Sequence, residues 1–166
     1  MVYYLRILSY LFTRPSELRL AKWADYNESE GLLSLYISKS QKDLIIPLPK
    51  QVITLLHELK DFTGHSEYIF QSHYGNTFRP LSEASAGRAI ARMGYQKVMT
   101  LHGHRAAART ILDEEFMVDV KYIEAQLAHT DKSDPNKGAY NRSKYLAARE
   151  KVLQQWADYL DSLRDG

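Results

Sequence analysis

One hairpin-like segment is the strongest constraint that this sequence places on its fold. Apolar runs at 32–37 and 44–48 flank the polar stretch 38–43, which predicts a β-hairpin whose second strand ends at Pro47 and Pro49. Elsewhere the apolar residues recur three and four positions apart, as they do on one face of a helix. The expected helices cover residues 3–12, 15–23, 52–63, 82–93, 101–109, 119–129 and 145 to the C-terminus. We therefore expect an α+β fold that is predominantly helical, with a small antiparallel β-sheet.

Length and composition narrow the class of protein. The 166 residues contain no linker-like or repeated segment, so we expect one domain over 1–166. Cysteine is absent, which excludes disulfides, a thiolate zinc site and a cysteine nucleophile. The apolar runs are too short to span a bilayer, and no signal-peptide pattern follows Met1. These features predict a cytoplasmic protein with no membrane partner.

The formal net charge of +2 is unevenly distributed along the chain. Residues 79–109 carry six basic side chains and one acidic side chain, which gives a net charge of +5. Residues 121–151 carry seven basic and four acidic side chains, which gives a net charge of +3. Acidic residues separate these basic segments. If the fold brings the segments together they form one positive face for phosphates; otherwise they are a solvated surface with uneven charge. Charge alone leaves both interpretations open.

His102 and Arg105 stand three positions apart at the start of a predicted helix, so their side chains share one face. A helix N-terminus offers unpaired N–H groups and the positive end of the helix dipole. With an imidazole and a guanidinium added, this position suits a phosphate. A capping histidine beside a surface arginine would account for the same pattern.

Two more basic residues lie at the ends of predicted elements. Arg14 directly precedes Pro15 at a helix start, and its planar guanidinium matches phosphate oxygens in a bidentate way. A surface ion pair with Glu17 is the alternative interpretation. Lys39 lies in the hairpin loop, where it is either solvated or reaches into a DNA groove.

Two further candidates flank the polar loop 130–138. His129 ends a predicted helix, where a histidine is also a favourable partner for the helix dipole, and Tyr140 follows the loop as a nucleophile or as a packing residue.

Other kinds of active site lack support in the sequence. His102 and His104 are two positions apart, which does not suit a metal site, and the sequence contains neither a phosphate-binding P-loop nor a Gly-x-Ser-x-Gly motif.

These features occur in an order that resembles the tyrosine recombinases, and most closely the prophage and genomic-island integrases. The motifs are Arg14 in Arg-Pro-Ser-Glu-Leu-Arg, Lys39 in a hairpin ending Ile-Ile-Pro-Leu-Pro, His102 and Arg105 in His-Gly-His-Arg, His129 in Leu-Ala-His, and Tyr140 in Ala-Tyr-Asn-Arg-Ser. The resemblance covers nearly the whole chain and implies the catalytic-domain fold of that family.

The resemblance also implies a site. Tyr140 would be the nucleophile that attacks the scissile phosphate, and Arg14 and Arg105 would clamp that phosphate. Lys39 would protonate the leaving 5′-oxygen, and His102 would help to deprotonate Tyr140. His129 would donate a hydrogen bond to the phosphate. The attack would give a covalent 3′-phosphotyrosine link between the protein and the DNA, which conserves the energy of the phosphodiester bond. No cofactor and no metal are therefore expected. The expected DNA contacts are Arg14, Lys39, Arg105, Arg88, Arg92 and Arg142.

The implied function is site-specific recombination, the integration or excision of mobile DNA. The implied partners are double-stranded attachment sites and, in the full-length protein, a tetramer on DNA. The resemblance further implies N-terminal DNA-binding domains, which this chain lacks, so that 1–166 corresponds to the C-terminal catalytic domain. A non-cleaving fragment that binds DNA or a partner integrase, and a topoisomerase-like relaxing activity, are the alternative functions.

Some assignments within the resemblance have rivals. Lys42 competes with Lys39, although the distance from Pro47 favours Lys39. Tyr145 competes with Tyr140, but its place in the final predicted helix favours packing. The apolar stripe of that helix either covers the chain's own core or packs on a neighbouring protomer.

Overall fold

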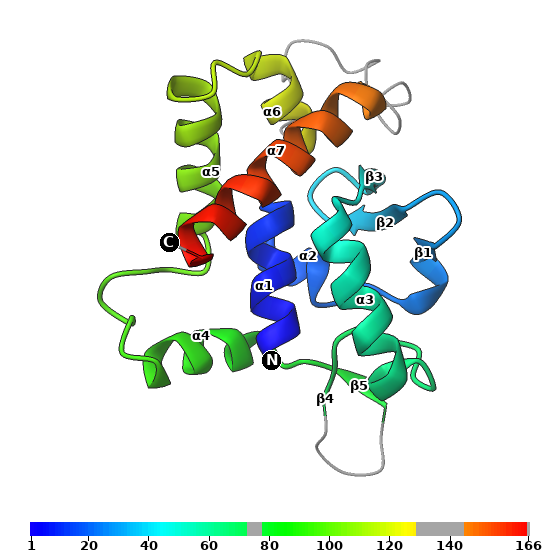
Figure 1. Cartoon of the computed structure of the whole chain (residues 1–166). Coiled ribbons are helices and arrows are strands. Elements are labelled where there is room, and N and C mark those ends of the chain that lie inside the picture. Colours follow the sequence, from blue (N-terminus) through cyan, green and yellow to red (C-terminus); the bar gives the residue numbers. More distant parts are fainter. Residues whose placement is uncertain (73–77, 129–144, 166) are drawn as a thin grey trace.

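The computed structural model describes residues 1–72, 78–128 and 145–165 (Figure 1). The helices are α1 (Val2–Leu11), α2 (Pro15–Leu18), the 3-10 helix η1 (Trp23–Asp25), α3 (Lys50–Thr63), α4 (Glu83–Arg92), α5 (Gly103–Glu114), α6 (Val120–Gln126) and α7 (Leu146–Asp165). The strands are β1 (Tyr26–Asn27), β2 (Leu32–Ile37), β3 (Lys42–Pro47), β4 (Gln71–Ser72) and β5 (Arg79–Pro80). The expected α+β class, with helices predominating, is confirmed.

The predicted hairpin is formed by β2 and β3, which pair antiparallel from Leu32↔Pro47 to Ile37↔Lys42. Leu33, Leu35 and Ile37 are buried and Tyr36 is exposed, so alternate residues of β2 face the core. The two-residue strand β1 adds to the other edge of β2, and β4 pairs with β5 in a separate ribbon. The sequence pattern did not predict β1, β4 or β5, because strands this short carry no readable alternation.

Helix α1 lies at the centre of the structure, with α3 beside it and α7 crossing it (Figure 1). Residues three and four apart, such as Ile7 and Leu11, are completely buried on this helix. The helix ends at Leu11, and its C-cap residue Phe12 adopts the left-handed conformation (φ 37°) while its ring remains buried. That turn redirects the chain toward α2 and the residues of the candidate site.

Helix α7 packs on the core of its own chain. Leu153, Trp156 and Ala157 are buried, the Trp156 ring meets Phe12 edge to face at 6.3 Å, and its Nε1 donates to the Ser9 carbonyl at 2.9 Å. The predicted apolar stripe of α7 therefore covers the core of its own chain at these positions, while Leu163 near the end of the helix is exposed.

A search of the described residues for membrane-spanning helices finds none of sufficient length and hydrophobicity.

The structure corrects two predicted helix boundaries. The helix expected over 15–23 ends at Leu18, because the backbone that follows it pairs with a distant segment. The Ala21 carbonyl accepts a hydrogen bond from Ile69 N at 3.0 Å, and Lys22 forms an isolated antiparallel β-bridge with Tyr68. The helix expected over 101–109 begins at Gly103 and continues to Glu114.

Candidate active site

Arg105 joins the C-terminal ends of two helices. Its Nη1 donates to the carbonyl of Phe12 at 2.9 Å and its Nη2 to the carbonyl of Leu127 at 3.0 Å. Phe12 is the C-cap of α1 and Leu127 the C-cap of α6. Carbonyl groups at helix C-termini lack partners within the helix and attract positive charge. The guanidinium therefore fixes both ends, and these two bonds leave further N–H donors for a ligand.

The backbone that leads into Arg14 is held by a series of side chains. Successive carbonyls of residues 11–13 accept hydrogen bonds from Gln126 Nε2 at 3.0 Å, Arg105 Nη1 at 2.9 Å and His104 Nε2 at 3.2 Å. Two of these donors belong to α5 and one to α6, so both helices contact the same stretch of chain. The position of Arg14 is thus set by α5 and α6 together.

Arg14 is the N-cap of α2, and Pro15 at the first position gives the helix its start. Arg14 Nη1 donates to Glu17 Oε1 at 3.0 Å, and the side chains are 21% and 5% exposed. The pair that the sequence suggested at the surface is therefore largely buried. Burial raises the pKa of the Glu17 carboxyl above its usual value, although the charges of Arg14 and Arg105 oppose this rise.

The two arginines interact electrostatically. Burial, and to a smaller extent the charge of Arg14, lower the pKa of Arg105 to about 10, whereas the charges of Glu17 and Glu124 oppose the shift. The buried Glu17 carboxylate and the more exposed Glu124 carboxylate thus offset part of the charge of the two guanidinium groups. A site of this kind is suited to an anion.

His102 is the N-cap of α5, but its side chain makes no capping hydrogen bond. Thr100 Oγ1 performs that role by accepting from Gly103 N at 3.0 Å. The exposed His102 instead lines a hollow of about 130 Å³ together with Pro15 and other residues of α1, α2 and α4. The hollow brings His102 to the same side of the molecule as the start of α2, and the alternative of a capping histidine is wrong.

His104 is a residue whose role the sequence reasoning missed. It is buried on one stripe of α5 with Ala108 and Leu112, a spacing of four residues that was available as a signal. Its Nε2 lies 3.2 Å from the Thr13 carbonyl, which can only accept, so this hydrogen bond forms in the tautomer that carries the proton on Nε2.

The burial of His104 predicts a loss of stability in acid. Burial lowers its pKa from 6.5 to about 4, so the unfolded chain binds a proton between these values that the folded chain does not. The contribution of His104 to the unfolding free energy is complete above pH 6.5 and falls by about 3 kcal/mol as the pH drops to about 4. Denaturant titrations between pH 7 and pH 4 should show a shallower dependence for His104→Gln than for the parent. The exposed His65→Gln should keep the parent dependence, and parallel curves for His104→Gln and the parent would contradict the assignment.

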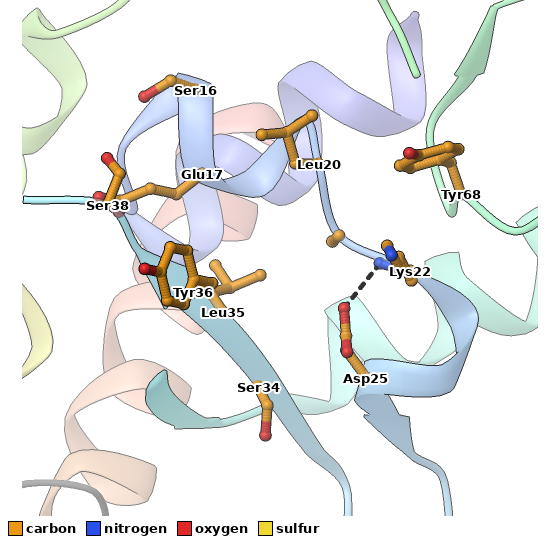
Figure 2. Close-up of a pocket in the computed structure, with 11 residues that line it drawn as sticks. Ser16, Glu17, Leu20, Lys22, Asp25, Ser34, Leu35, Tyr36, Ser38 and Tyr68 are labelled. Atoms are coloured by element: carbon orange, nitrogen blue, oxygen red, sulfur yellow. Dashed lines mark hydrogen bonds between the residues drawn. The ribbon is translucent and has the colours of Figure 1, made fainter. Parts of the chain in front are cut away.

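Lys39 lies in the exposed turn between β2 and β3. Its neighbour Ser38 lines a cavity of about 400 Å³ between α2 and β2, and Figure 2 shows Glu17 and Tyr36 around the same space. The turn that carries Lys39 therefore borders the helix of the Arg14–Glu17 pair. Lys42, its rival, is the first residue of β3.

The other expected contacts divide into two groups. Arg88 and Arg92 are exposed on α4, opposite the buried Ala86 and Ala89, and Arg88 Nη2 donates to Ser82 Oγ at 3.3 Å. The remaining candidates lie outside the described residues; they are His129, Tyr140 and Arg142. Over 1–72, 78–128 and 145–165, no three His, Asp or Glu side chains form a group that could hold a metal ion.

Comparisons with solved structures agree with the fold. The XerA recombinase superposes with a TM-score of 0.62 at 20% identity, over 90% of this chain and 53% of that one. A lambda integrase (75–356) dimer bound to a COC′ core site gives a TM-score of 0.60 at 19% identity, over 79% and 50% of the two chains.

Sequence relatives identify the family. The prophage integrase IntZ of Escherichia coli K12 is 32% identical over 164 residues, which are 98% of this chain and 40% of that protein. The prophage integrase IntA of the same strain is 37% identical over 157 residues, 93% and 37% of the two chains. This chain thus spans well under half the length of both relatives. The sequence model of the Phage integrase family matches residues 3–146, and the chain belongs to this family.

Proposed function

We propose that this chain is the catalytic domain of a site-specific DNA recombinase that cuts and rejoins DNA through a 3′-phosphotyrosine. The observation that carries the proposal is the convergence of Arg14 and Arg105. Arg105 donates to the Phe12 carbonyl, two residues before Arg14, and both arginines interact with the buried Glu17 carboxylate. The names of the relatives, prophage integrases, agree with this activity.

The reaction is a transesterification. The phenolic oxygen of Tyr140 attacks the phosphorus, the bond from phosphorus to the 5′-oxygen breaks, and Lys39 gives that oxygen a proton. Arg14 and Arg105 stabilise the additional negative charge of the pentavalent transition state. His102 helps to remove the phenolic proton and His129 hydrogen-bonds the phosphate. The 5′-hydroxyl of a partner strand then reverses the step and joins the exchanged strands.

The partners follow from the same proposal. Lambda integrase has been solved as a dimer on a core site and as a tetramer on a Holliday junction. We infer that this chain likewise acts on double-stranded attachment sites within a tetramer of longer protomers. Arg88, Arg92 and Arg142 supply phosphate contacts outside the reaction centre.

Covalent trapping is the direct test. The chain is incubated with attachment-site DNA that carries a 5′-bridging phosphorothiolate, whose thiolate leaves without protonation and cannot rejoin efficiently. We expect a denaturant-resistant adduct whose modified peptide contains Tyr140. Salt-dependent DNA binding with no adduct would overturn the proposal in favour of a non-cleaving fragment. Relaxation of supercoiled DNA without preference for the attachment site would favour a topoisomerase-like activity.

The role of Lys39 gives a second expected outcome. On ordinary DNA, Lys39→Ala should slow cleavage by about 100-fold to 1,000-fold, the usual contribution of a general acid. On the phosphorothiolate substrate the same variant should cleave at nearly the parent rate, because no proton is needed. Lys42→Ala is the matched variant in the same hairpin and should keep the parent rate on both substrates. If Lys42→Ala shows the loss and the recovery instead, the general acid is Lys42.

A further inference from the structure

Arg149 is a buried cation that the proposed chemistry does not use. It is 1% exposed on α7, and its Nε and Nη2 donate to Oε1 of Gln126 at 3.2 and 2.7 Å. Within the described residues, its buried Nη1 has no hydrogen-bond partner and its guanidinium forms no ion pair. A buried charge without a counter-charge costs stability that an apolar side chain would not. We therefore look for the role of Arg149 in its contact with the side chain of Gln126.

Arg149 holds the side-chain amide of Gln126 in one orientation. Gln126 is 1% exposed, and with Oε1 occupied by Arg149 its Nε2 points to α1 and donates to the Leu11 carbonyl at 3.0 Å. The oxygen and nitrogen ends of an amide can exchange by rotation, and only the nitrogen end donates. The guanidinium accepts nothing, so it selects the orientation in which the link to α1 forms.

That link runs beside the two bonds of Arg105. Leu11 precedes Phe12 and Gln126 precedes Leu127, so Gln126 and Arg105 connect the ends of α1 and α6 at adjacent residues. A shift between the two helix ends would separate the carbonyls that Arg105 bridges. The orientation of Arg105 therefore depends on the link that Gln126 makes.

We infer that Arg149 is a positioning residue for Arg105 and acts through Gln126, which locks the junction of α1 and α6 in the geometry that presents the arginine pair. The inference rests on the proposed function, because Arg105 is there assigned to the scissile phosphate. A packing role for Arg149 would not require the Gln126 amide.

Two variants test the inference. Arg149→Met keeps the volume and removes the hold on the amide. Gln126→Glu strengthens the pairing with Arg149 but has no N–H to give to the Leu11 carbonyl. Both should slow adduct formation by about 10-fold to 100-fold, as expected for a misplaced transition-state group, while DNA affinity stays within about threefold of the parent. If Arg149 serves only packing and charge, Gln126→Glu will react at the parent rate, and that result overturns the inference.

Hydrogen exchange gives a second readout that needs no reaction. The amides of Glu17 and Leu18 bond to the Arg14 carbonyl, and both variants should exchange there about tenfold faster than the parent. Arg164→Met, an exposed position on the same helix that pairs with Asp161, should change neither readout. Parent exchange rates in Arg149→Met and Gln126→Glu contradict the inference even if the parent forms no adduct. A parent without adduct but with accelerated exchange in the variants overturns the proposed function alone.

Discussion

Replacing Tyr140 with phenylalanine is expected to lower formation of the covalent protein–DNA adduct by at least about 1,000-fold, because the phenolic oxygen is the atom that bonds to phosphorus. DNA affinity should remain within a few-fold of the parent, since phosphate contacts by arginine and lysine dominate binding. The measurement is single-turnover trapping on the phosphorothiolate substrate, with affinity determined at two salt concentrations. Tyr140 lies outside the described residues, so this experiment assigns it by chemistry alone.

Tyr145→Phe is the matched comparison. The Tyr145 ring, immediately before α7, meets Tyr122 edge to face at 5.2 Å, a contact that phenylalanine preserves. We expect this variant to form adduct at the parent rate. Undiminished adduct in Tyr140→Phe, with loss in Tyr145→Phe, would move the nucleophile to Tyr145.

Elements with a clear period were predictable from the sequence. The hairpin of β2 and β3 and the long helices α3 and α7 follow from apolar spacing and from Pro47 and Pro49, which end the second strand. The end of α2 was not predictable, since it depends on hydrogen bonds from residues near position 69, far along the chain. Local pattern fixes the kind of element, whereas distant contacts set where it stops.

The candidate site divides in the same way. Motif order singled out Arg14, His102 and Arg105, but it did not show what holds them. The carbonyls of residues 11–13 are backbone groups, which leave no trace in side-chain pattern, and their donors come from α5 and α6. The same reason hid the burial of Glu17, whose spacing from Arg14 fits a surface pair equally well.

Arg105 both holds the ends of α1 and α6 and, in the proposed function, contacts the scissile phosphate. Its replacement should therefore affect stability and catalysis separately. Arg105→Ala leaves the carbonyls of Phe12 and Leu127 without their donor and removes a charge from the phosphate site. We expect cleavage to fall at least about 1,000-fold, DNA affinity to fall about tenfold, and the unfolding free energy to drop by about 1–3 kcal/mol. Arg109→Ala, a half-exposed position on the same helix where Arg109 pairs with Glu124 and Asp113, should change the unfolding free energy by less than about 1 kcal/mol.

Arg105→Lys separates the structural effect from the chemical one. A lysine keeps the positive charge but lacks the planar fork that spans two carbonyls and a phosphate at once. DNA affinity should therefore remain near the parent value while cleavage still falls about 100-fold. If the lysine variant cleaves like the parent, charge alone is sufficient and the double contact of Arg105 with α1 and α6 has no part in catalysis. If it binds as weakly as Arg105→Ala, the loss arises from a collapsed junction rather than from the phosphate contact, and hydrogen exchange at Leu18 should then rise equally in both variants.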